Sequence, residues 1–254
     1  MNSSMVFAHK EVREIGRTWR IWVLPAVVLF FAATGPPLAR FTPELISSIA
    51  GDQLGQIKLP APTYRDSYAQ WTKNVSQIIM FVLIIIYGSL ISSEVKSGTA
   101  VFALTKPLSR TAFVTVKAVI HSCYVAGVLA AGTLITWAGT AAFFGEAPGG
   151  PLWTAGGLLL VLSVLFVTLM TLLSVAISST AGAAGAGVGI YAVLSIGAIW
   201  KPLSSYSPAG LAGNAASIAA GTGEPSLLWP VTTSVVISAA LVALAVAVFQ
   251  HKEL

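Results

Sequence analysis

Six apolar segments recur along this chain of 254 residues, each near or above the length of about 20 residues that a helix needs to cross the hydrocarbon core of a membrane. Inside lipid, only helices and closed barrels satisfy every backbone N–H and C=O group, and segments of this length favour helices. The composition agrees, because 56% of the residues are hydrophobic and only 9% are charged, against about a quarter in an ordinary soluble domain. We therefore expect an all-α, polytopic membrane protein, with residues 1–254 forming a single transmembrane domain. The expected spans are Ile21–Ala39, Val75–Ser93, Val116–Phe144, Trp153–Ser178, Ala186–Trp200 and Leu227–Phe249.

The distribution of Lys and Arg predicts which side of the membrane each loop faces, because positive charge resists translocation. With the N terminus inside, nine of these residues lie on the cytoplasmic side and five lie outside. The inner residues crowd two short segments beside the spans. The sequence therefore predicts a multi-pass protein of a cell membrane, with the bacterial inner membrane preferred and both termini cytoplasmic. The inner residues are Lys10, Arg13, Arg17, Arg20, Lys96, Lys106, Arg110, Lys117 and Lys252.

Residues 1–20 have the pattern of an amphipathic helix that lies in the membrane interface before bending into the first span. Apolar residues recur at steps of three and four, which places them on one helical stripe, and basic residues lie beside it. We expect the basic residues to meet anionic lipid head groups or a cytoplasmic partner. The alternative is the cytoplasmic end of one long tilted helix. The apolar stripe comprises Met5, Ala8, Val12, Ile15, Trp19 and Trp22, and the residues assigned to the interface are Lys10, Arg13, Arg17, Trp19 and Arg20.

Two long polar segments, residues 40–74 and 201–226, are predicted on the outer side. In the first, Thr42-Pro43-Glu44 has the form of a helix start, because a capping hydroxyl is followed by proline in the first turn. We therefore expect a short external helix there. The second segment is either a short helix that re-enters the outer leaflet or an ordinary outer loop.

Small and hydroxyl-bearing residues enter several spans. Gly185 and Gly189 form a small-xxx-small pair, which favours close helix packing over a gating hinge. The hydroxyl groups have two interpretations: they either bond to carbonyl oxygens of their own helix and serve packing, or they form a weakly polar lining for a transient path. The candidates for such a path are Thr133, Thr136, Ser163, Thr168 and Thr171.

Catalytic and metal-binding patterns are absent from the sequence. Every Asp and Glu falls in a terminus or loop of the predicted topology, which disfavours ion-coupled transport by intramembrane carboxylates. The three histidines have no metal-ligand spacing within a span, and the single Cys123 has no partner thiol. No G-x-x-x-x-G-K-[ST] loop is present. We therefore expect this chain not to be an enzyme and to hold no metal or cofactor of its own.

The stretch "ISSEVKSGTAVFALTKPLSR", residues 91–110, opens a predicted cytoplasmic loop over residues 94–115. Gly98 permits a sharp exit from the second span, Pro107 ends a short apolar helix, and Ser109 caps the third span. The result is a compact element presented to the cytoplasm. Because the chain has no nucleotide-binding loop of its own, we interpret this element as a site at which a soluble partner transmits force to the membrane domain.

The pattern E-x-K-x-G-T, followed by L-T-K-P-L-S-R and then Lys117, resembles the first cytoplasmic loop of ABC-2 type transporter permeases. The resemblance implies that this loop contains a coupling helix that seats in a groove of a separate ATP-binding subunit, which binds ATP and Mg. It also implies two such ATPase subunits and a second permease chain, which is identical or different. The complex is expected to contact membrane lipids and no nucleic acid. The residues that it assigns to the ATPase contact are Glu94, Lys96, Gly98, Thr99, Pro107, Ser109 and Arg110.

Two functions from different classes follow from these observations. The first is the permease subunit of an ATP-driven exporter, with its translocation path between two membrane halves; its substrate stays open. The second is a membrane scaffold or sensor that uses the same loop to recruit a partner and opens no path. A membrane enzyme ranks third, because no polar catalytic cluster is evident.

Overall fold

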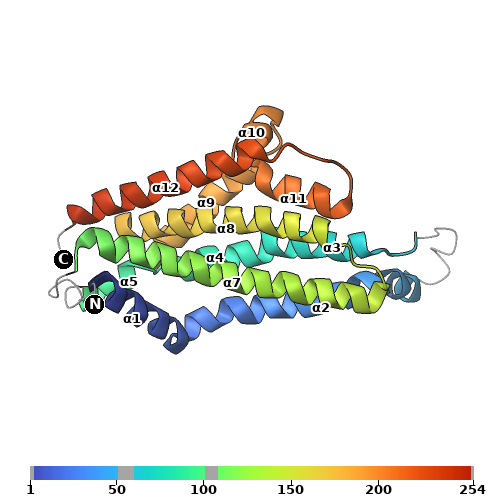
Figure 1. Ribbon diagram of the computed structural model, residues 1–254, viewed down its shortest axis with the longest axis horizontal. Helices are drawn as coiled ribbons and strands as arrows, with labels where there is room; N and C mark the ends of the chain where they lie inside the picture. Colours follow the sequence, from blue (N-terminus) through green and yellow to red (C-terminus); the bar gives the residue numbers. More distant parts are fainter. Residues whose placement is uncertain (1–2, 51–59, 101–107, 253–254) are drawn as a thin grey trace.

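The computed structural model describes residues 3–50, 60–100 and 108–252, and every regular element in these ranges is a helix (Figure 1). Six helical segments are long and apolar enough to cross a membrane, which confirms the predicted fold class. The helices are α1 (Ser3–Arg17), α2 (Trp19–Ala50), α3 (Tyr64–Asn74), η2 (Val75–Ile79), α4 (Met80–Tyr87), α5 (Ser92–Lys96), α7 (Arg110–Phe144), α8 (Gly149–Ala176), α9 (Thr180–Gly197), α10 (Lys201–Tyr206), α11 (Gly210–Ala220) and α12 (Leu228–Gln250).

The long helices form one elongated bundle around α8 (Figure 1). Helix α8 packs against α7, α9, α11 and α12 and has the largest share of buried residues among the six spanning segments found in the described ranges, whereas α9 and α12 have the smallest. We call the end that carries α1, α5, the start of α7 and the end of α12 the termini end. The opposite end carries the last turns of α2 and the start of α3.

The first span continues further than the sequence suggests. Helix α2 runs without interruption to Ala50 and contains Pro43, so the prediction of a separate external helix that begins at Thr42 is wrong. The Thr42 hydroxyl donates to the Leu38 carbonyl oxygen at 2.5 Å, as a residue inside a helix does, and caps no new helix. Tertiary packing supports this continuity, because the Phe41 ring lies edge-on to Phe143 of α7, with 6.1 Å between centroids.

The second span is a broken helix. Its middle turn, η2, is a π-helix, and the Tyr191 hydroxyl of α9 donates to the Ser76 carbonyl oxygen in that turn. After α4 ends, the chain turns and restarts as α5. The Ser174 hydroxyl of α8 accepts hydrogen bonds from the N–H groups of Ile91 and Ser92 at 2.8 and 2.9 Å. This side chain therefore satisfies amide groups that the break leaves without helical partners.

Residues 201–226 contain two short helices, α10 and α11. Helix α11 packs on α8 and α3, and its Leu211, Ala215 and Ala219 are buried. These side chains recur at steps of four residues, as on one face of a helix. The segment is thus more than an extended loop, whereas its depth in a membrane stays a prediction.

The glycine of α9 that packs closely against other helices is not one of the two that the sequence predicts. A Cβ atom built on Gly187 would lie 2.5 Å from Met170 Sδ and 2.8 Å from Ile84 Cγ2, whereas a Cβ atom on Gly185 or Gly189 meets no other part of the described residues within 4 Å. The prediction that Gly185 and Gly189 pack closely is therefore wrong within this chain. Gly187 lies between them on another face of the same helix, the face that α4 and α8 approach.

We predict that Gly187→Leu destabilises the protein, because the added side chain overlaps two neighbouring side chains and overpacking typically costs about 1–3 kcal/mol. Gly185→Leu is the matched control, with the same change of residue two positions away in open space. Thermal unfolding in detergent, followed by tryptophan fluorescence, should show a lower melting temperature for the first variant alone. Equal melting temperatures would contradict the assigned packing of α9.

Candidate functional site: a buried charge cluster at the termini end

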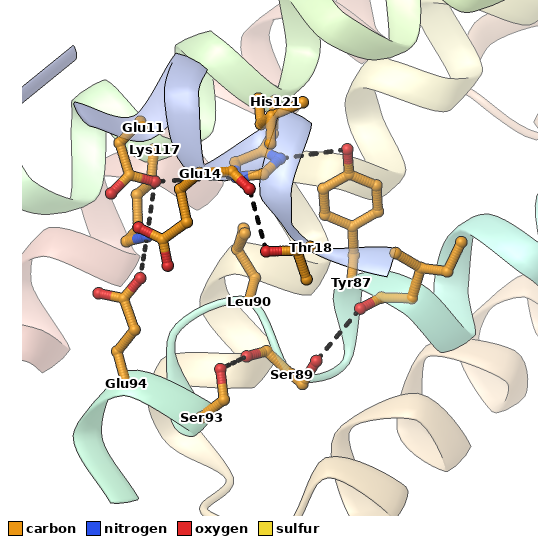
Figure 2. Close-up of a pocket in the computed structure, with 12 residues that line it drawn as sticks. Glu11, Glu14, Thr18, Tyr87, Ser89, Leu90, Ser93, Glu94, Lys117 and His121 are labelled. Carbon is orange, nitrogen blue, oxygen red and sulfur yellow. Dashed lines mark hydrogen bonds and ion pairs between the residues drawn. The ribbon is translucent and has the colours of Figure 1, made fainter. Parts of the chain in front are cut away.

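Lys117 lies in the third turn of α7, where its side chain is only 2% exposed. Helix α7 begins where Ser109 Oγ accepts a hydrogen bond from the Ala112 N–H group, which confirms the predicted cap. The Lys117 ammonium lies 2.7 Å from Glu11 Oε2 of α1 and 2.5 Å from Glu94 Oε1 of α5 (Figure 2). We call Glu11, Glu94 and Lys117 the buried charge cluster. It joins α5 and α7 to α1, whose Glu11 is 106 residues away in sequence from Lys117.

The surroundings of the Lys117 ammonium explain how a charge is accommodated there. Two of its three N–H groups have carboxylate acceptors. It also lies over the rings of Phe113 and Phe7, 5.4 and 5.9 Å from their centroids. Aromatic faces attract a cation, and buried charges need partners of opposite sign. Lys117 is therefore compensated by protein groups alone.

Further polar groups surround the cluster. Lys10 pairs with Glu14 at 2.8 Å and with Glu11 at 3.4 Å. Partial burial acts to lower the pKa of Lys10, but the hydrogen bond to Glu14 and the charges of the neighbouring carboxylates outweigh it, so that this pKa lies above its ordinary value. The His121 imidazole lies between Glu11, 4.0 Å from Nε2, and the Tyr87 hydroxyl, 3.3 Å from Nδ1.

The residues assigned to the ATPase contact lie in different environments. Gly98 has a φ of 72°, in the left-handed region that glycine favours, which agrees with the predicted sharp turn. Lys96 and Thr99 are exposed beside it, whereas Glu94 belongs to the buried charge cluster. Pro107 lies outside the described residues.

Arg110 contacts the far end of the same chain. Its Nη1 donates to the carbonyl oxygens of Phe249, Gln250 and Lys252 at 3.0, 2.9 and 2.8 Å. These carbonyl groups lie at the C-terminal end of α12, where the helix dipole favours a cation. Lys252 in turn donates to the Val175 carbonyl oxygen at the end of α8. Arg110 and Lys252 thus fasten two helix C-termini at the termini end.

The basic residues of α1 divide into two groups. Arg13 and Arg17 are exposed, whereas Lys10 is ion-paired; the side chains of Trp19 and Arg20 lie outside the described part. The helix is interrupted at Thr18, so α1 and the first span are not one continuous helix. The exposed face of α1 also carries Met5 and Val12, as an interfacial helix requires, and its position in a membrane stays a prediction.

The five candidates for a path lining are all buried within this chain. Four of them donate to a carbonyl oxygen of their own helix, which is the packing arrangement. Only the Thr136 hydroxyl has no hydrogen-bond partner among the described residues. The donors are Thr133, Ser163, Thr168 and Thr171.

Glu11 and Lys117 were not among the predicted site residues. A partial signal was present, because Lys117 opens a predicted span, where a lysine either extends to the head groups or pairs with a carboxylate of another element. Which carboxylate this is depends on how α1 folds back on α7, and spacing along the chain carries no such information.

We predict that Lys117→Met lowers the free energy of unfolding by about 3–5 kcal/mol, because it leaves two buried carboxylates without their positive partner. Lys96→Met is the control, since Lys96 is exposed. A triple variant that adds Glu11→Gln and Glu94→Gln should recover most of the loss. The stability of the three variants is compared by the fraction of protein that stays monodisperse after heating. A triple variant as unstable as Lys117→Met would show that the loss of side-chain packing, and not the unpaired charge, causes the destabilisation.

We predict that Arg110→Gln loosens the end of α12, because three carbonyl groups lose one charged donor. Hydrogen exchange over residues 246–252 should become faster, by about tenfold for a lost contribution near 1.4 kcal/mol. Arg13→Gln, a change of the same residue type on exposed α1, is the control. Unchanged exchange in both variants would mean that Arg110 does not hold this helix end.

A family model described as ABC-2 family transporter protein matches residues 5–216, from α1 into α11. No curated protein matches the chain. The family match covers most of the chain and includes the buried charge cluster and five of the six spanning segments. On this match and on its six apolar helices, the chain belongs to the ABC-2 transporter family and is a multi-pass membrane component of transport.

Proposed function

We propose that this chain is the permease subunit of an ATP-driven exporter and that a separate ATPase subunit docks on its exposed turn, residues 96–99. The observation that carries the proposal is the position of this turn. Lys96, Ser97 and Thr99 are exposed, whereas Glu94, two residues before the turn begins, is buried against Lys117. A partner that moves the turn therefore acts on the buried charge cluster.

The contacts of α5 support a role in transmitting force. Glu94 bonds to Lys117 of α7, which bonds to Glu11 of α1. The start of α5 is also fixed to α8, because Ser174 accepts from its amide groups. The turn is thus connected to three helices by charge and hydrogen bonds. An element attached in this way transmits displacement and does not absorb it.

The interior of one chain favours a path between two chains. Buried apolar side chains fill the space around α8, and the hydroxyl groups of α7 and α8 that we considered for a path mostly bond within their own helices. In this proposal a second permease chain, identical or related, completes the path. Two ATPase subunits bind ATP and Mg, and the termini end faces the cytoplasm. Arg13 and Arg17 then meet anionic head groups there.

The conformation of Gly98 provides a test of the docking site. We predict that Gly98→Val reduces co-purification of the ATPase, because a β-branched residue is strained at a φ of 72° and will distort the turn. Gly98→Asn is the matched control, since asparagine tolerates this conformation. Among the described residues, no atom lies within 4 Å of a Cβ atom built at this position, so the test depends on backbone conformation and not on space.

The experiment is a pull-down from native membranes in mild detergent, with the yield of inserted permease measured in parallel. We expect a P-loop ATPase with the wild type and with Gly98→Asn, and several-fold less with Gly98→Val at equal insertion. Equal recovery with all three would place the docking site elsewhere. If the wild type brings down no ATPase, the scaffold or sensor function replaces the exporter.

A further inference from the structure

One hydrogen bond joins α9 to the π-helical turn of the second span and has no part in the function proposed above. It runs from the Tyr191 hydroxyl to the Ser76 carbonyl oxygen in η2. We propose that Tyr191 is a latch with two positions. In the closed position, which this structure shows, its hydroxyl holds Ser76; in the open position, its ring lies in an adjoining pocket between α8, α9 and α11. The latch belongs to the chain itself and does not depend on an ATPase.

The π-helical turn gives the Ser76 carbonyl group a choice of two donors. In a regular α-helix its donor would be the Met80 N–H group, four residues later. Here that N–H group bonds to the Val75 and Gln77 carbonyl oxygens, and the Tyr191 hydroxyl donates to Ser76 in its place. When the latch opens, Met80 bonds to Ser76 again and the extra residue of the turn shifts along the span. The carbonyl group thus has a donor in both positions.

A pocket beside Tyr191 has room for its ring. The pocket has a volume of about 210 Å³, several times the volume of about 30 Å³ that one water molecule takes in the liquid. Its walls include Leu162 of α8, Leu194 of α9, and Ala212 and Gly213 of α11. Aliphatic and small residues of this kind accept an aromatic ring without burying an unpaired polar group of their own.

The Tyr191 hydroxyl also has a partner in the open position. Ser195 follows one turn later on α9 and lines the pocket, and its hydroxyl donates to the Tyr191 carbonyl oxygen at 2.8 Å. The lone pairs of the Ser195 oxygen are therefore available to accept a hydrogen bond from the phenol. Because both positions satisfy the same polar groups, the latch meets the condition for an element with two discrete states.

In the closed position, Tyr191 is the main attachment of α9 to the second span. Of the three buried residues of α9, which are Ala183, Gly187 and Tyr191, only Tyr191 has a large side chain. Its ring lies edge-on to Phe81 of α4 and Phe166 of α8, with 5.9 and 5.3 Å between centroids. Opening the latch therefore loosens α9 from the span that leads, through α5, to the exposed turn at residues 96–99.

The test is hydrogen exchange of the full chain in detergent, followed by mass spectrometry of peptides that cover residues 75–81. Tyr191→Phe removes the hydroxyl and keeps the ring, so exchange in the turn should become about fivefold faster, as expected for one lost hydrogen bond. Gly213→Leu should slow this exchange several-fold, because the new side chain fills the pocket and holds the ring in the closed position. Among the described residues, no atom lies within 4 Å of a Cβ atom built on Gly213, so the backbone accepts this change.

Two controls separate the latch from general effects on stability. Gly213→Ala also removes a helical glycine but leaves the pocket open, and Tyr206→Phe makes the same tyrosine change at an exposed position, so both should exchange like the wild type. Peptides of α8 that contain Phe166 report on the bundle as a whole.

Faster exchange over residues 75–81 alone in Tyr191→Phe, together with slower exchange in Gly213→Leu, would support the latch. Unchanged exchange in either variant, or an equal acceleration in the α8 peptides, would overturn it. Because no ATPase is present in this measurement, such a failure is distinct from a failure of the docking site at residues 96–99.

Discussion

A single buried lysine determines how the termini end of this protein is assembled. Lys117 brings a positive charge into an apolar helix, and a charge in that position is stable only with opposite charges beside it. No carboxylate of α7 is available, because none occurs between Arg110 and Phe144. The partners must therefore come from other elements, and they come from α1 and α5. The folding back of α1 and the restart of the second span as α5 both serve this requirement.

The two ends of the bundle are held by different forces. At the termini end, charged groups carry the contacts: the buried charge cluster, Arg110 on the end of α12, and Lys252 on the end of α8. At the opposite end, the contacts between described residues include the hydrogen bond of 2.7 Å between the hydroxyl groups of Ser67 and Thr140, and the Asp66 carboxylate, which accepts hydrogen bonds from Thr63. Charged contacts are sensitive to a partner or ligand that brings its own charge, and neutral packing is much less so.

Much of the fold could be predicted from the sequence, because its signals are local. Span length gave six helices, Gly98 adopts the positive φ expected of a turn glycine, and Ser109 caps the third span. The continuity of α2 through Pro43 could not be predicted, since the local pattern is that of a helix start and packing against α7 outweighs it.

The candidate site was less predictable than the fold. Glu94 was selected as a residue that contacts a partner, but the structure pairs it with Lys117 inside the protein. Arg110, at the start of α7, was selected for the same role, and its side chain donates to the Phe249 carbonyl oxygen at the end of α12, 139 residues away in sequence. Gly187, and not Gly185, makes the close approach on α9. In each case the chemistry of the residue was evident from the sequence, whereas the identity of its partner depends on which helices are neighbours.

The π-helical turn in the second span has a consequence for comparing sequences. Hydrogen bonds from residue i to i+5 accommodate one more residue than an α-helical turn does. Removing one residue from Val75–Ile79 would restore a regular helix and leave α3 and α4 facing as they do. Removing one from the α-helical turns between Trp71 and Tyr87 would instead rotate α3 against α4 by about 100°, since an α-helix has 3.6 residues per turn. Trp71 and Tyr87, both buried now, could not then face the core together. When this span is aligned with that of a relative one residue shorter, the gap therefore belongs in this turn.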